Sequence, residues 1–176
     1  GVSPAIILKL LPNTIFLTLK DLGVDLPKYK EDVAPIEMTE SQERQYSQMD
    51  AVLKELARQD NRYLSCWLQN GLARPNSAFR YEEVNLTMPG NEHNVLKLPA
   101  IVTGKELLPK ENWLLEFCKD ERAIGRKVLV YLRQTGTRDI QDHIKETLES
   151  VGLRVTVLSG SVNPRKREDW IARKTP

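Results

Sequence analysis

The stretch from Arg126 to Ile171 constrains the fold most, because it alternates twice between a short apolar run and a helical pattern. The first apolar run is Lys127–Leu132, and the polar turn Arg133–Thr137 follows it. Apolar side chains then recur at the spacing of one helix face: Ile140, Ile144, Leu148 and Val151. Gly152, directly after them, is typical of a helix end.

The same pattern is then repeated. A second apolar run, Leu153–Leu158, leads to the turn Gly160–Asn163, and Asn163-Pro164 is typical of a helix start. We therefore predict an α/β fold in which strand, helix, strand and helix form part of a parallel sheet. Because ligands bind beyond the carboxyl ends of such strands, function is expected at the turns Gln134–Thr137 and Gly160–Asn163.

A helical hairpin is predicted before this unit, over residues 39–74. Thr39 and Gln42 form a capping box, and an amphipathic helix follows. Asp60 is expected to cap a second helix that ends before Pro75, with its inward side chains at Tyr63, Leu64, Trp67 and Leu68. The apolar face of the first helix is expected to consist of Tyr46, Met49, Val52, Leu53 and Leu56.

Residues 75–106 contain repeated Pro and Gly breaks, so they are predicted to form a long irregular loop. Pro109 should begin another helix that ends at Gly125. The side chains expected on its buried side are Trp113, Leu114, Phe117 and Cys118.

Composition limits the classes of protein to consider. The 176 residues are 40% hydrophobic and 28% charged, as in a soluble globular protein, and no apolar run approaches the length of a membrane span. Cys66 and Cys118 are isolated, which favours a reducing cytoplasm over a disulfide framework. The chain begins Gly-Val without an initiator methionine, which suggests an excised piece or a processed product.

Charge is distributed unevenly along the chain. Residues 126–176 carry 11 Lys/Arg and 6 Asp/Glu, whereas residues 1–125 carry 15 and 18, for an overall charge of +2. The basic end therefore coincides with the predicted sheet unit. This asymmetry fits a polyanion such as nucleic acid, and it fits equally a solvated basic face.

Several catalytic motifs are absent from the sequence. Thr103–Glu106 resembles a phosphate-binding P-loop only superficially, because a glutamate occupies the place of the magnesium-binding hydroxyl. No Gly-x-Ser-x-Gly or His-Glu-x-x-His pattern occurs, and His93 and His143 are lone histidines. We expect His143 to be a surface or boundary residue, and we assign no catalytic residue and no metal site.

The two turns carry the candidate binding residues. Small polar groups and cations stand there at predicted helix starts, which bind phosphate through free amides and the helix dipole. Plain capping and solubility remain the alternative explanation. The candidate DNA-binding residues are Gln134, Thr135, Thr137, Arg138, Gly160, Ser161, Arg165 and Arg167.

At these residues the chain resembles the C-terminal motor half of superfamily II helicases of the Swi/Snf type, and within them a bacterial and phage-type branch of helicase-related proteins. Residues 127–139 are similar to motif IV, a strand with its DNA-facing turn. Residues 152–160 and 165–171 resemble the next conserved block, and residues 107–115 resemble the helix that enters this lobe. Residues 16–27 and 37–42 resemble the segment that leaves the first motor lobe.

The resemblance implies a fragment in three parts. Residues 1–38 would lead out of the first motor lobe, and residues 39–106 would be a helical insertion with an irregular loop. Residues 107–176 would be the first half of the second RecA-like lobe, truncated before motifs V and VI. We expect that an incomplete sheet would expose an edge, which favours self-association or covering by the N-terminal segment.

The resemblance also implies a function for the intact parent, an ATP-dependent DNA helicase or translocase. Its cofactors would be ATP and Mg²⁺, and its partners would be DNA, contacted through the backbone without base reading, and the first motor lobe. The Walker motifs and motifs V and VI are missing here, so we expect the fragment to hydrolyse no ATP alone and to need no cofactor. No membrane partner is expected, because no apolar run is long enough to span a bilayer.

Two alternatives from other classes remain open. The same strand–turn–helix unit would serve a Rossmann-like domain that binds a nucleotide sugar or a small phosphate, although no Gly-x-Gly-x-x-Gly turn is present. The predicted helical hairpin at residues 39–74 would also suit a protein-interaction module.

Overall fold

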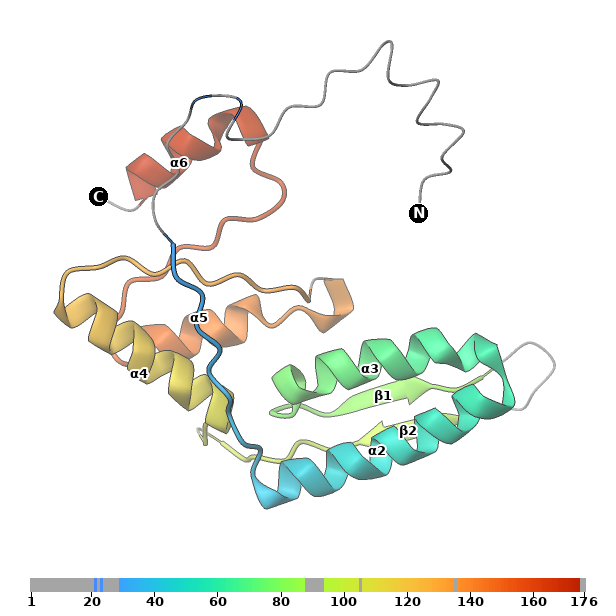
Figure 1. Cartoon of the computed structure of the whole chain (residues 1–176). Helices are drawn as coiled ribbons and strands as arrows, with labels where there is room; N and C mark the ends of the chain where they lie inside the picture. The colour runs from blue at the N-terminus through green and yellow to red at the C-terminus, as the bar shows by residue number, and fades with distance from the viewer. Residues whose placement is uncertain are drawn as a thin grey trace, which may run out of the picture. The chain divides into compact units, whose positions relative to one another are not determined.

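The structure is a computed structural model that describes residues 29–87, 94–104, 106–134 and 136–174, together with Asp21 and Gly23. The chain divides into two compact units, residues 1–35 and 36–176, and the second contains all the helices and strands that are described. This second unit is a mixed helix-and-sheet fold whose sheet has two antiparallel strands (Figure 1).

The predicted helical hairpin is present. Helix α2 (Glu40–Gln59) begins with the expected capping box, in which Thr39 Oγ1 accepts from the Gln42 amide and Gln42 Oε1 accepts from the Thr39 amide. Asp60 then caps a 3-10 turn, η2 (Asn61–Tyr63), which continues into α3 (Leu64–Ser77). The expected signals for both helix starts are therefore confirmed.

The inward face of α3 differs from the prediction. Leu64 and Leu68 are 43% and 51% exposed, so the expectation that they point inward was wrong. The stripe that faces the interior is largely polar, and hydrophobic spacing alone therefore gave the wrong phase. It consists of Tyr63, Trp67, Asn70, Arg74 and Ser77.

Helix α3 also runs through Pro75, where the sequence predicted that it would stop. A proline removes one helical hydrogen bond, but here it lies in the last turn, so only a short stretch of helix follows it. Asn76 Nδ2 and Ser77 Oγ donate to the carbonyl oxygens of Leu72 and Ala73, four residues earlier, and so help to hold that last turn.

Part of the expected irregular loop is an antiparallel hairpin. Strand β1 (Glu82–Asn85) pairs with β2 (Val95–Leu98), with Glu82 opposite Leu98 and Asn85 opposite Val95. The hairpin packs on α2 and α3, and the Tyr63 hydroxyl donates to the Leu86 carbonyl. This first core cluster is formed by Met49, Leu53, Ala57, Tyr63, Val84, Leu86 and Leu98.

Helix α4 (Pro109–Ala123) begins at the predicted proline. Gly125 ends it with φ +76° and, with the Arg126 amide, bonds back to the carbonyls of Arg122 and Glu121. Two of the four expected inward side chains are largely exposed, because Trp113 and Phe117 stack on each other at 42% and 39% exposure. Cys118 is buried and Leu114 packs against the core, as predicted, and Leu115 is a buried residue that the sequence did not select.

Helix α5 (Gln141–Glu149) follows the 3-10 turn η3 (Gly136–Arg138), and Gly152 ends it with φ +80°, as predicted. After Asn163 the chain forms η4 (Pro164–Lys166) and α6 (Arg167–Lys174), and Asn163 Oδ1 accepts from the Arg165 amide. The predicted helix end at Gly152 and the predicted helix start at Asn163-Pro164 are thus confirmed.

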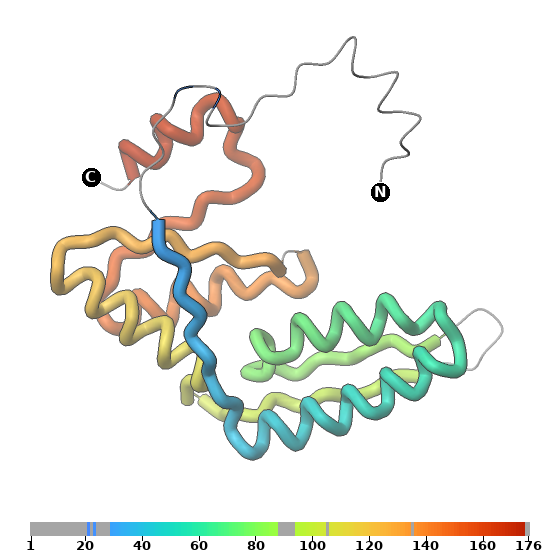
Figure 2. Tube along the Cα trace, viewed as in Figure 1, coloured from blue at the N-terminus to red at the C-terminus, as the bar shows by residue number. Residues whose placement is uncertain are grey.

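The two apolar runs between these helices are not strands. Residues 127–132 and 153–158 have no regular secondary structure and are called the open segments below. In the described chain they do not pair with each other as parallel strands (Figure 2). Only one side of the first segment is covered, since Leu129 and Tyr131 are 90% and 88% exposed. A strand of a parallel sheet is normally covered on both faces, and this segment is not.

The covered side of these open segments belongs to a second core cluster. Val130, Leu153 and Val155 pack against side chains from the two neighbouring helices: Leu115, Cys118 and Leu148. The order segment, turn, helix, segment, turn, helix is therefore kept, while the sheet pairing is not. Among the described residues, no helix is long and apolar enough to cross a membrane.

Candidate nucleic-acid interface

The first turn, residues 133–139, leads from an open segment into α5. Gly136 has φ +68°, a backbone conformation that favours glycine, and the Asp139 amide donates to the Gly136 carbonyl at 3.0 Å. Asp139 also begins the helix, because its carboxylate accepts from the Gln141 amide at 2.8 Å. The turn is therefore closed by its own hydrogen bonds.

Two of the predicted site residues in this turn contact the helical hairpin. Arg138 Nη1 donates to the Gln69 carbonyl at 2.8 Å, and its Nη2 donates to Asn70 Oδ1 at 2.9 Å. Gln134 Nε2 donates to the Leu72 carbonyl at 3.3 Å. Arg138 also lowers the pKa of the Cys66 thiol, although burial dominates and raises that pKa overall.

Arg80, which the sequence gave no reason to select, donates to the backbone of the same turn. Its Nη1 donates to the Asp139 carbonyl at 3.0 Å and its Nη2 donates to the Thr137 carbonyl at 3.3 Å. These two carbonyls flank Arg138 in the chain. Arg80 and Arg138 thus link the turn to residues 69–80 in both directions.

A network of charged side chains connects Arg80 to the buried Arg74. Glu82 Oε1 accepts from Arg80 Nε at 3.0 Å and from Nη2 at 2.9 Å, and Glu82 Oε2 accepts from the Ser77 hydroxyl at 2.9 Å. Arg74, only 2% exposed, lies 3.5 Å from Glu82 Oε2. Burial lowers the pKa of Arg74, while Glu82 acts in the opposite direction.

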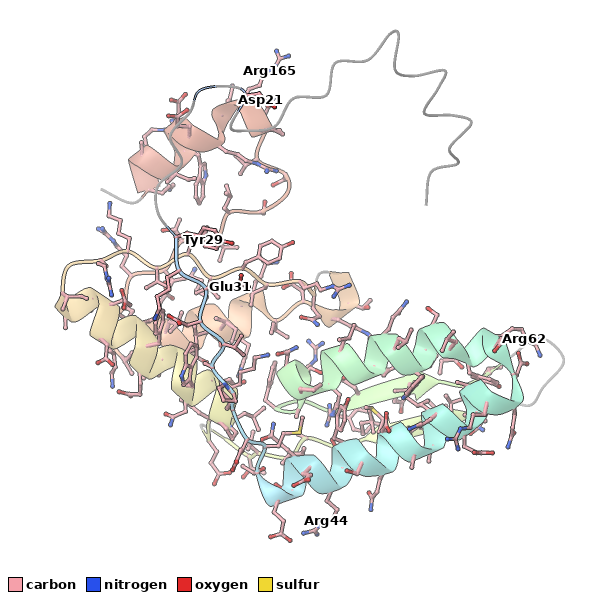
Figure 3. The ribbon with its side chains drawn as sticks, in the orientation of Figure 1. Asp21, Tyr29, Glu31, Arg44, Arg62 and Arg165 are labelled. Atoms are coloured by element: carbon pink, nitrogen blue, oxygen red, sulfur yellow. The ribbon has the colours of Figure 1, made fainter. Side chains whose placement is uncertain are left out.

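The second turn, residues 159–163, is more open. Gly160 and Ser161 are exposed, and the hydroxyls of Ser159 and Ser161 bond to each other. Arg165 projects outward near the start of α6 (Figure 3), whereas Arg167 Nε donates to the Val162 carbonyl at 3.2 Å. This turn therefore combines one outward arginine with one that is tied to the backbone.

The predicted site residues fall into two separate groups. Thr137 is exposed in the first turn beside Arg138, and the second group gathers around Gly160. Among the described residues, no hydrogen bond or ion pair joins the two turns. Thr135 lies outside the described residues. The structure thus gives each turn its own local geometry.

His143 has a more specific place than the sequence suggested. Its ring stacks on Phe79 with the ring centroids 3.5 Å apart, and its Nε2 lies 2.7 Å from Glu111 Oε1. Glu111 is buried and its other oxygen accepts from the Leu108 amide at the start of α4. The pair joins α4 to α5, and its side chains are 28% and 6% exposed.

No cluster of metal-binding side chains is found in the described parts of the chain. Comparison of the chain with models of known protein families, with curated proteins and with solved structures gives no match.

The sequence pointed to the two turns and missed Arg80, Asn70 and Glu82. These residues lie roughly 50 to 70 positions before the turn that they contact or support, and no local motif marks them. The one available signal was the polar side of α3, where Asn70 and Arg74 recur at helical spacing.

Proposed function

We propose that this chain is part of an ATP-dependent DNA helicase or translocase and contributes phosphate-backbone contacts of its second, RecA-like motor lobe. The contacts would come from the turns at residues 133–139 and 159–167. ATP and Mg²⁺ would belong to the intact parent, together with the first motor lobe, in a cytoplasmic setting. The chain alone would hydrolyse no ATP, because the Walker motifs are absent from its sequence.

The observation that carries the proposal is the fixed geometry of the first turn. Its backbone is held by Arg80 from outside and by the Asp139 amide from within, while Gly136 and Thr137 remain exposed. A turn whose backbone is already ordered pays less entropy when a phosphate binds its amides and hydroxyl. Such contacts position a nucleic acid without reading its sequence.

Arg138 is compatible with this role although it contacts α3. Two of its N–H groups donate to Gln69 and Asn70, and a guanidinium has further donors in the same plane. A phosphate could share those donors, or could replace Asn70 as the acceptor. Arginine is well suited to phosphate because it can bind two oxygens at once.

The arrangement around the second core cluster also supports the proposal. Val130 and Val155, from the two open segments, pack on the same cluster built by α4 and α5. Each segment leads to a turn and then to a helix, in the order that a motor lobe requires. Parallel pairing of these segments would bring both turns to one edge.

The experiment is fluorescence anisotropy of labelled single- and double-stranded DNA with the whole chain, in a series of salt concentrations. We expect binding whose affinity falls steeply with salt, because phosphate contacts release counterions. Thr137→Ala and Arg165→Ala should each weaken binding, and Arg165→Ala should also lower the salt slope by about one. The control is Arg44→Ala, on the exposed face of α2 away from both turns (Figure 3).

One observation favours a second candidate, a helical protein-interaction module. Leu64, Leu68 and Leu72 recur every four residues along α3 and are 43%, 51% and 55% exposed. Such a stripe suits an amphipathic partner helix. A protein captured by the chain and lost in Leu68→Ser would support this candidate. Salt-independent or absent DNA binding would count against the first.

A further inference from the structure

We infer that Arg80 is a positioning residue for the DNA-facing turn, acting from the helical hairpin half of the chain rather than from the turn itself. The inference rests on the proposed function and adds to it a residue outside the predicted turns. It follows from three features: which carbonyls Arg80 binds, what holds its guanidinium, and how little of the side chain reaches solvent.

The first feature is the choice of acceptors. Arg80 Nη1 and Nη2 donate to the carbonyls of Asp139 and Thr137 at 3.0 and 3.3 Å. These carbonyls bracket Arg138 at the end of the 3-10 turn η3, which the Asp139 amide closes by donating to the Gly136 carbonyl. Because Arg80 binds both carbonyls, the orientations of Arg138 and of the amide groups in the turn are fixed.

The second feature is the support behind the guanidinium. Glu82 Oε1 accepts from both Nε and Nη2 of Arg80, so the plane of the guanidinium is set by a carboxylate. Glu82 is itself held by the Ser77 hydroxyl at 2.9 Å and faces the buried Arg74. The ring of Phe79 lies 5.8 Å from the Arg80 guanidinium carbon. Through Glu82, Arg80 is thus connected to the buried side chains Ser77 and Arg74 of α3.

The third feature separates positioning from direct contact. The Arg80 side chain is 30% exposed, and each of its three nitrogens donates to a protein acceptor. Arg165, in contrast, projects outward and is exposed. Arg80 therefore acts on DNA binding through the turn, whereas Arg165 would act on the phosphate.

This role needs an arginine rather than any cation. A lysine keeps the positive charge, but its ammonium is a single point and cannot span two carbonyls and a carboxylate in one plane. Arg80→Lys therefore removes the geometry and leaves the net charge unchanged. It separates positioning from simple attraction of a polyanion.

The test compares Arg80→Lys with a matched control, Arg62→Lys. Arg62 also pairs with a carboxylate two residues away, Asp60, but it lies at the junction of α2 and α3 and makes no bond to the turn (Figure 3). For each protein, DNA affinity is measured by anisotropy at several salt concentrations. Amide exchange is measured in the absence of DNA.

We expect Arg80→Lys to weaken DNA binding about tenfold, the factor for the loss of one charge-assisted hydrogen bond. Exchange of the Asp139 amide should become faster, because that amide closes the turn, while exchange within α2 should stay the same. Arg62→Lys should change neither quantity. Together these results would show that Arg80 acts through the backbone of the turn.

Other results would overturn the inference. Wild-type affinity in Arg80→Lys would mean that only its charge matters. Weakened binding with unchanged exchange at Asp139 would place Arg80 on the DNA itself. Faster exchange throughout α2 would indicate a general structural role. Failure of the proposed function is recognised separately, because the unmodified chain would then bind no DNA.

Discussion

Replacement of Arg74 by alanine should destabilise the fold more than replacement of any other charged residue in the helical hairpin. Arg74 is 2% exposed and donates to acceptors from several elements. Gln45 Oε1 on α2 accepts at 2.8 and 2.6 Å, and the Pro99 carbonyl after β2 accepts at 2.6 Å. The Arg80 carbonyl accepts at 3.0 Å.

The magnitude follows from what the alanine leaves behind. The Arg80 carbonyl would lose the guanidinium donor, and the Ser77 and Pro99 carbonyls would each lose one of two donors. Glu82, with its side chain 18% exposed, would lose one of its two cationic neighbours. Removal of one partner from a buried charged network costs about 3–5 kcal/mol, since the remaining groups stay desolvated. That is a large share of a typical unfolding free energy of about 5–15 kcal/mol.

The assay is urea unfolding followed by far-UV circular dichroism. Arg74→Ala should lower the free energy of unfolding by about 3–5 kcal/mol, whereas Arg44→Ala should lower it by less than about 0.5 kcal/mol. Arg44 pairs with Glu40 on the exposed face of α2 and serves as the control. A loss below about 1 kcal/mol for Arg74→Ala would refute the reasoning, because the network would then contribute no more than a surface pair.

Three further predictions test separate parts of the structure. Leu53 is 0% exposed, so Leu53→Ala should lower the free energy of unfolding by about 3 kcal/mol. Val52 is 43% exposed, so Val52→Ala should lower it by less than about 1 kcal/mol. Urea unfolding measures both values. Burial raises the pKa of the Cys66 thiol, so the folded state holds that proton more tightly and loses stability relative to the unfolded chain as pH rises above about 8.5. Alkylation of Cys66 by iodoacetamide at neutral pH should accordingly be slower than that of a free thiol, and slower still in Arg138→Gln; equal rates would contradict this assignment. Asn70→Ala removes one acceptor of Arg138 and should raise DNA affinity several-fold by anisotropy, whereas an unchanged affinity would mean that the two acceptors do not compete.

Most helix ends were predictable from the sequence because their signals are local, whereas the expected stop of α3 before Pro75 was wrong. The capping box at Thr39, the glycines 125 and 152, and Asn163 before Pro164 all act within a few residues of the chain. Such signals depend on hydrogen bonds between near neighbours and on glycine's access to positive φ. Their positions in the structure match the prediction.

The inward faces and the sheet were harder to predict because they depend on distant partners. The inner stripe of α3 contains Arg74, which finds its acceptors only once Gln45 and Pro99 are in place, and Asn70, whose side chain accepts from the distant Arg138. A strand likewise depends on a neighbour for its hydrogen bonds. The open segment at residues 127–132 has strand composition but is covered on one side, with Leu129 exposed.

The candidate site shows the same division. The turns could be located from their polar residues and glycines, because a turn needs that local chemistry. The contacts that fix the first turn could not be predicted, since Arg80 and Asn70 reach it from far along the chain. The sequence thus indicates where a phosphate could bind, while the structure adds the contacts that fix the conformation of the first turn.

The most direct test of the central claim is an NMR titration of the isotope-labelled chain with a short DNA, with backbone amide shifts followed residue by residue. The account predicts that shifts concentrate at residues 133–139 and 159–167, and that they diminish as salt is added. Shifts confined to Leu64, Leu68 and Leu72 on α3, or no shifts at low salt, would contradict it.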